Sequence, residues 1–399
     1  MSKEIRNIIC AVIAAALAIG FISIFFLLGE GGTEKEKVKV GFIYDGDAGT
    51  PYSANFMIAA RSLTAEYGEK AELIEKYNIP HENAAEIIDG LVSDGCDIIF
   101  TTSFGYGDAA KKAAQKYSEV QFCAATCDNS DVSLENYHTF MGEICQGRYV
   151  SGVLAGRKLK EMIDSGIITA EQAVVGYVAA YPVAEVISGY TAFLLGVRSE
   201  CPNAVMHVRY TNSWTDFSLE KRQAERLIDD GCVIISHHTN TIGSAIACEN
   251  ASMPYTVYHV GYNQDMMNAA PTASLTSCRI DWTPYIKEAV GAVLSSREIE
   301  KTVKGNVHGK DMSGGFREGW VSLIDINTAA VSKEDIKFAE ETVNKISSGK
   351  ISIFKGDYKG TDPEDPNDTI DLNTEFIENK DSSAPSFHYI LQDIVIIDN

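Results

Sequence analysis

Short apolar runs alternate with amphipathic stretches along most of the chain, beginning near residue 38. Residues 82–95 and 108–117 carry apolar positions at helical spacing. The runs that flank them have the length and composition of buried strands. These predicted strands are residues 39–45, 71–77, 96–103 and 120–126. Strands that alternate with helices of about ten to fifteen residues indicate βαβ units and a parallel sheet.

The same alternation restarts in the second half of the chain. Its predicted strands are residues 173–180, 204–210, 232–238 and 256–261. Two successive sets predict two doubly wound α/β lobes. We expect the first lobe at 38–150 and the second at 151–279. Residues 280–399 should supply a hinge crossover, part of the first lobe and the C-terminal segment.

The C-terminal segment begins with a predicted helix near residues 333–348. An acidic stretch rich in proline, residues 359–369, follows it after a short apolar run. This composition predicts an exposed, mobile loop.

The N-terminus carries the strongest indication of a cellular compartment. Lys3 and Arg6 precede an uncharged apolar run at residues 8–28, which is about 30 Å long as a helix. The positive flank predicts a cytoplasmic N-terminus and an extracytoplasmic remainder. We therefore expect residues 1–37 to form a signal anchor and linker that hold the protein at the cell membrane. Export after signal cleavage is the alternative.

Charge and cysteine content exclude several classes of protein. The formal net charge of −21 repels nucleic acid, so no nucleic-acid partner is expected. The nine cysteines are scattered and contain no CxxC pair, which argues against a disulfide framework or a zinc knuckle.

Ligands of doubly wound sheets bind beyond the carboxyl ends of the strands, where the strand order reverses. The loops after the predicted strands nearly all carry an aromatic side chain, an amide or a carboxylate. They are residues 45–56, 104–108, 181–185, 211–217, 237–241 and 261–265. Aromatic rings stack on flat heterocycles, and the polar groups supply directional hydrogen bonds. Each side chain taken alone is also explained by packing or turn formation.

Signatures of catalysis and metal binding are missing from the sequence. It contains no HExxH, no GxSxG and no phosphate-binding GxxxxGK[ST] motif. His237 and His238 are adjacent, so on a strand they point to opposite faces, one buried and one near the ligand. We expect no metal and no cofactor. A glycosidase-like pair of carboxylates stays open.

Several long segments of the chain are distinctive, namely residues 39–49, 176–202, 212–241, 275–290 and 346–356. They resemble the basic membrane protein (BMP/PnrA-like) family of ABC transporter substrate-binding proteins. The resemblance covers about residues 38–397 and implies a type I periplasmic-binding-protein fold, with two lobes that close about a hinge. It also implies an importer for purine nucleosides or related purines, with an ABC permease and an ATPase as partners.

The loops and the resemblance together indicate the ligand-binding residues. The resemblance implies that an aromatic side chain from each lobe stacks on the purine base. Tyr52 or Phe56 would stack from the first lobe, and Trp214 from the second. Arg279 stands at or near a lysine that grips ribose in nucleoside binders, and the DWxPY segment after it is closer to a branch associated with free bases. The expected set is Asp45, Tyr52, Asn55, Phe56, Phe104, Tyr106, Tyr181, Trp214, His238, Thr239, Asn263, Asp265, Arg279 and Trp282.

We therefore expect an extracytoplasmic binding protein, not an enzyme, that closes on a purine nucleoside or purine base. Two alternatives stay open. One is a ligand-sensing ectodomain coupled to a membrane signalling partner. The other is an enzyme on the same scaffold, which product formation from a bound purine would reveal.

Overall fold

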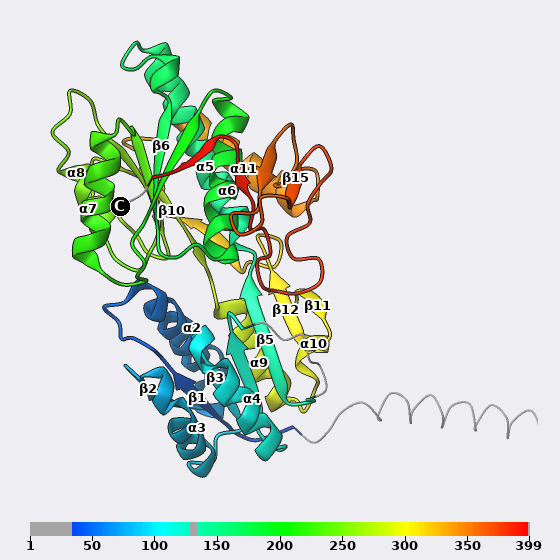
Figure 1. Cartoon of the computed structure of the whole chain (residues 1–399). Helices are drawn as coiled ribbons and strands as arrows, with labels where there is room; N and C mark the ends of the chain where they lie inside the picture. Colours follow the sequence, from blue (N-terminus) through cyan, green and yellow to red (C-terminus); the bar gives the residue numbers. More distant parts are fainter. Residues whose placement is uncertain (1–33, 128–133, 398–399) are drawn as a thin grey trace, which may run out of the picture.

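A computed structural model of the chain describes residues 34–127 and 134–397. Two α/β lobes, each built on a seven-stranded sheet, lie one above the other, and a small three-stranded sheet follows near the C-terminus (Figure 1). The expected α/β class with two lobes and parallel sheets is confirmed. The expected anchor at residues 8–28 lies outside the described residues. Within the described ranges, no helix has the length and apolar character needed to cross a membrane.

The first lobe contains the sheet β11-β12-β5-β4-β3-β1-β2, in which only β11 runs antiparallel to its neighbour. Its strands are β1 (Val38–Ile43), β2 (Ala71–Lys76), β3 (Ile98–Thr101), β4 (Gln121–Ala125), β5 (Tyr137–Gly142), β11 (Asn306–His308) and β12 (Asp311–Gly314). Its helices are α2 (Pro51–Tyr67), α3 (Ala84–Ser93), α4 (Gly107–Lys116), α9 (Thr283–Leu294) and α10 (Ile299–Thr302). The strand order reverses at β1, so the loops after β1 and β3 lie at the switch point.

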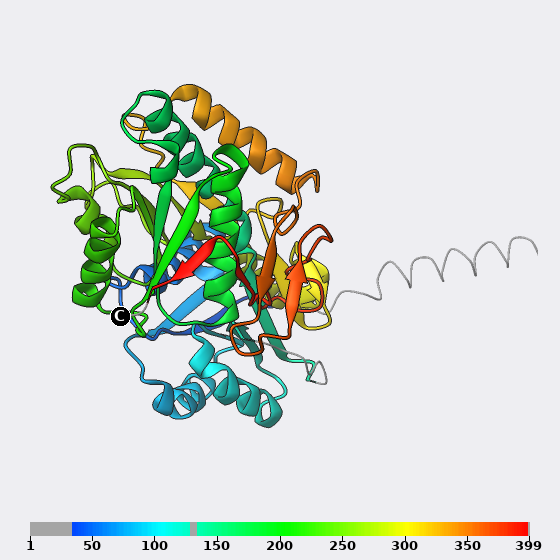
Figure 2. The same cartoon turned by 45° about the horizontal axis from the view of Figure 1, so that its top comes forward.

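The second lobe contains the sheet β13-β10-β9-β8-β6-β7-β17, in which only β13 is antiparallel. Its strands are β6 (Val174–Ala179), β7 (Val205–Tyr210), β8 (Ile234–His238), β9 (Tyr258–Tyr262), β10 (Ser274–Ile280), β13 (Val321–Ile324) and β17 (Ile394–Ile396). Its helices are α5 (Ile144–Asp164), α6 (Ala184–Glu200), α7 (Phe217–Asp229), α8 (Gly243–Glu249) and α11 (Lys333–Ser347). Here the switch point is at β6, between β7 and β8. Figure 2 shows α11 in orange on the outer side of this lobe, where it packs against α5.

Three short segments connect the lobes. They join β5 to α5, β10 to α9, and β12 to β13. The middle segment contains Trp282, which is only 1% exposed and stacks on Phe56 of α2 with ring centroids 4.4 Å apart. Phe140 of β5 meets the same indole edge-on at 5.5 Å. One connection is therefore anchored directly in the aromatic core of the first lobe.

Helices α5 and α6 pack closely enough that their contact requires glycine. A Cβ added at Gly152 would lie 2.2 Å from the carbonyl oxygen of Phe193, and one at Gly156 would lie 2.3 Å from that of Val197. Gly196 makes the reciprocal approach to α5, 2.0 Å from the oxygen of Tyr149. This close packing holds the C-terminal half of α6 directly against α5.

The acidic stretch at residues 359–369 is more ordered than its composition predicts. Its ends form β14 (Lys359–Thr361) and β15 (Thr369–Asp371), which pair as an antiparallel hairpin, and β16 (Ile390–Leu391) pairs with the other edge of β14. The turn between β14 and β15 is exposed, as predicted. The expectation of a mobile loop is replaced by a sheet that packs its apolar positions, among them Leu391, into the core of the second lobe.

Candidate functional site

The strand tips of the two lobes meet beside the crossovers. Asn55 of α2 donates from Nδ2 to Oδ1 of Asn263, at a distance of 3.3 Å, which directly links the first lobe to the second. Both side chains are buried. We call the surrounding group the interlobe site. It consists of Tyr52 and Asn55 from the first lobe, and Tyr181, Glu185, Trp214, His238, Tyr262 and Asn263 from the second.

The first lobe contributes the beginning of α2, which follows the loop after β1. Tyr52 is partly buried, and its hydroxyl donates to the carbonyl oxygen of Thr102 at 2.7 Å. Burial raises the pKa of Tyr52 well above its ordinary value, and the charges of Asp45 and, across the lobes, Glu185 raise it further. Tyr52 therefore stays a neutral hydroxyl. Asp45 is exposed and accepts a hydrogen bond from the hydroxyl of Ser53 at 2.9 Å.

The second lobe contributes a run of four rings from the tips of four strands. Tyr181 follows β6 and lies 5.6 Å from Trp214, which follows β7. Trp214 lies 6.2 Å from His238 at the end of β8, and His238 lies 4.7 Å from Tyr262 at the end of β9. Trp214 remains 38% exposed, whereas His238 is buried. The run thus contains an accessible indole next to a buried imidazole.

His238 is the polar member of this run. Its Nε2 lies 3.4 Å from Oε1 of Glu185. Burial lowers the pKa of His238, and the positive charge of Arg148 lowers it further, so the ring is neutral at pH 7. In the part of the chain that the structure describes, Nδ1 of His238 and Nδ2 of Asn263 have no hydrogen-bond partner. Unpaired buried polar groups are costly, so the amide of Asn263 favours a ligand that completes it. Nδ1 of His238 lies against Gly189 of α6, where an added Cβ would be 2.9 Å away.

Arg148 of α5 packs against the last ring of the run, Tyr262. This α5 residue is fully buried, donates from Nη1 to the carbonyl oxygen of His237 at 2.9 Å, and lies 3.9 Å from the ring centroid of Tyr262. Arg148 was not predicted because it lies on a helix, α5, that follows β5, and β5 was not predicted as a strand. Glu185 and Tyr262 were also missed, although both belong to loops that were singled out, 181–185 and 261–265.

The loop at 237–241 is held by a buried carboxylate. Glu220 accepts hydrogen bonds from the hydroxyl of Thr241 at 2.7 Å and from the backbone N–H of Ser244 at 3.0 Å. His237 lies on the opposite face of β8 from His238, and its Nδ1 is 3.1 Å from Oγ1 of Thr239. Thr239 is buried, and its contact with His237 supports the loop in this structure.

The structure does not bring the other expected residues into the interlobe site. Phe56 and Trp282 stack on one another in the core, because α2 places Phe56 one turn deeper than Tyr52. Tyr106 is buried, and its hydroxyl donates to the carbonyl oxygen of Ile79. Phe104 is 72% exposed.

Two further expected residues, Asp265 and Arg279, lie near the tips of β9 and β10. Arg279 pairs with Asp281, with Nη2 and Oδ2 3.5 Å apart. Burial raises the pKa of the nearby Asp325; Asp265 raises it further and Arg279 lowers it. These charged groups form a separate cluster at the edge of the second sheet.

Replacing Asn263 with glycine tests the contact between the lobes. The backbone of Asn263 has φ +65°, which glycine adopts without strain, so the change removes the amide alone. One hydrogen bond contributes about 0.5–1.5 kcal/mol, so we expect the ratio of closed to open molecules to fall about 2- to 10-fold. Small-angle X-ray scattering should then show a larger radius of gyration.

A matched control is Asn78→Gly, at another asparagine with positive φ, whose amide bonds to Asp47 within the first lobe. It should scatter like the wild type. Identical curves for all three proteins would show that the Asn55–Asn263 contact does not hold the lobes together.

Comparisons with known proteins agree with this architecture. Residues 37–355 match the sequence profile of a family described as ABC transporter substrate-binding protein PnrA-like. The chain is 32% identical over 342 residues to a purine-binding protein of Brucella abortus (strain 2308), a match that covers 84% of this chain and 89% of that protein. It is 27% identical to a putative ABC transporter glucose-binding protein of Haloferax volcanii, covering 82% of this chain and 77% of that protein.

Solved structures show the same fold. A solute-binding protein of an ABC transporter system from Aeropyrum pernix K1 superposes with a TM-score of 0.63 at 16% identity, covering 82% of this chain and 94% of that chain. One from Conexibacter woesei gives a TM-score of 0.61 at 17% identity, covering 79% and 97%. The expected type I periplasmic-binding-protein fold is thus confirmed. The profile match over residues 37–355 and the relative at 32% identity show the family. The chain belongs to the PnrA-like family of ABC transporter substrate-binding proteins, which are binding proteins and not enzymes.

Proposed function

We propose that the interlobe site binds a purine, as the free base or the nucleoside. The observation that carries this proposal is the run of Tyr181, Trp214, His238 and Tyr262, which adjoins the contact between Asn263 and Asn55 of the first lobe. A planar base stacked on an aromatic side chain gains roughly 1–3 kcal/mol per partner. The relative named as a purine-binding protein supports the same ligand class.

The polar groups of the site suit the edges of a purine. Asn263 offers an unpartnered amide N–H, and the neutral imidazole of His238 both donates and accepts. Glu185 and Asp45 supply carboxylate acceptors for ring N–H or ribose hydroxyl groups. Contacts to both lobes exist only when the lobes are together, so ligand binding should shift the population toward the closed form.

We further propose that the protein works outside the cytoplasm and delivers its ligand to an ABC permease with an ATPase. The closed form presents both lobes in one fixed arrangement that a permease can recognise. An apolar run at residues 8–28 would hold the protein at the membrane. Copurification of a permease and an ATPase from membranes tests this role, and copurification of a signalling protein instead would favour the sensing alternative.

Isothermal titration with a ligand panel tests the proposed ligand class. The panel contains adenine, guanine, hypoxanthine and xanthine, their nucleosides, and glucose because of the relative from Haloferax volcanii. We expect saturable heat from at least one purine, at micromolar affinity or tighter, and none from glucose. Flat heats for every purine would remove the proposal, and heat from glucose alone would replace purines with sugars.

A further inference from the structure

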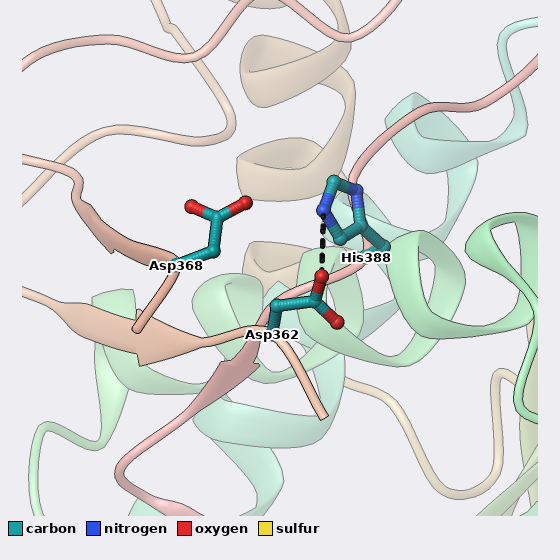
Figure 3. Close-up of side chains that lie close together, drawn as sticks. All are labelled: Asp362, Asp368 and His388. Carbon is teal, nitrogen blue, oxygen red and sulfur yellow. Dashed lines mark ion pairs between the residues drawn. The ribbon is translucent and has the colours of Figure 1, made fainter. Parts of the chain in front are cut away.

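A second group of chemically active side chains lies far along the chain from the interlobe site. Asp362 and Asp368 lie at the two ends of the turn between β14 and β15, and His388 precedes β16 (Figure 3). One ligand atom from each lies within 4.8 Å of the others. All three residues follow the segment matched by the family, which ends at residue 355. The family's ligand site therefore does not account for them.

The charge around this group is unbalanced. Asp362, Glu364, Asp365 and Asp368 stand within seven residues of each other. Within residues 34–127 and 134–397, neither Asp362 nor Asp368 forms an ion pair with a lysine or arginine. The imidazole of His388 is the nearest candidate, but its Nε2 is 3.7 Å from Oδ2 of Asp362, which is too far for a hydrogen bond.

Groups outside the cluster orient its members. Nδ1 of His388 lies 2.8 Å from the backbone oxygen of Ser386, which fixes the proton on Nδ1 and leaves the lone pair of Nε2 toward the carboxylates. The hydroxyl of Tyr389 donates to Asp368, with 3.2 and 3.3 Å to its two oxygens, and its ring stacks on His388 at 4.3 Å. Backbone and hydroxyl partners of this kind commonly hold metal-ligating histidines and carboxylates in place.

We propose that Asp362, Asp368 and His388 bind a divalent transition-metal ion of the zinc type. One imidazole nitrogen with two carboxylate oxygens suits zinc and its neighbours, whereas calcium takes six to eight oxygens and magnesium keeps mostly water. Three protein ligands leave a fourth position for water. The side chains of His388 and Asp362 are 40% and 19% exposed, so an ion reaches them from solvent.

The ion would act as a structural clamp. It would tie the β14–β15 hairpin to the segment before β16, and so stabilise the small three-stranded sheet. Asp362 and Asp368 come from the hairpin and His388 from the segment before β16, so an ion that joins them favours the folded arrangement by mass action. This inference does not rest on purine binding.

Zinc titration of the full chain, first stripped with EDTA, tests the proposal by calorimetry and thermal unfolding. We expect one equivalent to bind and to raise the unfolding temperature. His388→Gln and Asp362→Asn should each weaken binding at least about tenfold, since even outer partners of a metal site are worth 10- to 100-fold in affinity. Without zinc, both variants should unfold like the wild type, because their side chains are partly exposed.

Glu364→Gln is the matched control. It removes the same charge from the same turn but lies outside the three ligands, so its zinc affinity should equal that of the wild type. The eight cysteines in the described residues are buried, and the His388 variant separates any thiol binding from this site. Absence of zinc binding, or equal affinity in the wild type and His388→Gln, would overturn the proposal.

Discussion

Replacing Trp282 with alanine should lower the free energy of unfolding by about 3–5 kcal/mol. Its indole is buried, stacks face to face on Phe56 with an interplanar angle of 13°, and meets Phe140 edge-on. The substitution leaves a cavity in this aromatic core and frees the segment that joins β10 to α9. Urea denaturation followed by circular dichroism measures the loss.

Two further variants serve as controls for this prediction. Trp282→Phe keeps a ring against Phe56 and should lose distinctly less stability than the alanine variant. Trp214→Ala removes an indole that is 38% exposed and should lose less than about 1 kcal/mol. If Trp282→Ala were as stable as the wild type and lost only ligand binding, Trp282 would belong to the ligand site and its assignment to the core would be wrong.

Trp214→Ala should show the opposite behaviour in binding. Loss of one stacking partner costs roughly 1–3 kcal/mol, so the affinity for the best purine should fall about 5- to 150-fold while stability changes little. Trp214 is the most exposed ring of the run and lies between Tyr181 and His238. Titration calorimetry with the purine identified by the panel provides the measurement.

Phe338→Ala is the control for this substitution. Phe338 is a partly buried aromatic residue on α11, on the outside of the second lobe, where it packs against the guanidinium of Arg157. Its removal should leave purine affinity unchanged. Equal losses in both variants would point to a general effect on folding, and no loss at Trp214 would exclude its indole from the ligand contact.

The alternation of strands and helices was sufficient to predict the two-lobed fold, because parallel strands buried on both faces stand out as apolar runs. Strands β5 and β10 were not predicted. They are rich in polar residues such as His138 and Thr276, which the fold buries by giving them partners. His138 contacts Glu300 and Gln121, and the hydroxyl of Thr276 donates to the oxygen of Ile324 at 3.1 Å. Such partners come from distant segments, so their pairing is not visible in a local pattern.

The candidate site was predictable at the level of loops but only partly at the level of side chains. Strand-tip geometry pointed to the loops that carry Tyr52, Tyr181, Trp214 and His238, and the structure places these loops at the ends of the lobes that meet. It did not separate Tyr52 from Phe56, because both lie on one face of α2 and only the packing of Trp282 shows which is core.

The central claim is that a purine lies between the lobes, against the aromatic run and in reach of Asn55 and Asn263. A crystal structure with the tightest-binding purine of the panel measures this directly. We predict electron density for a planar base between the lobes, in contact with Trp214 and with Tyr52 on the opposite lobe. A base bound elsewhere on the protein, or an interlobe site left without it at saturating purine, would contradict the account.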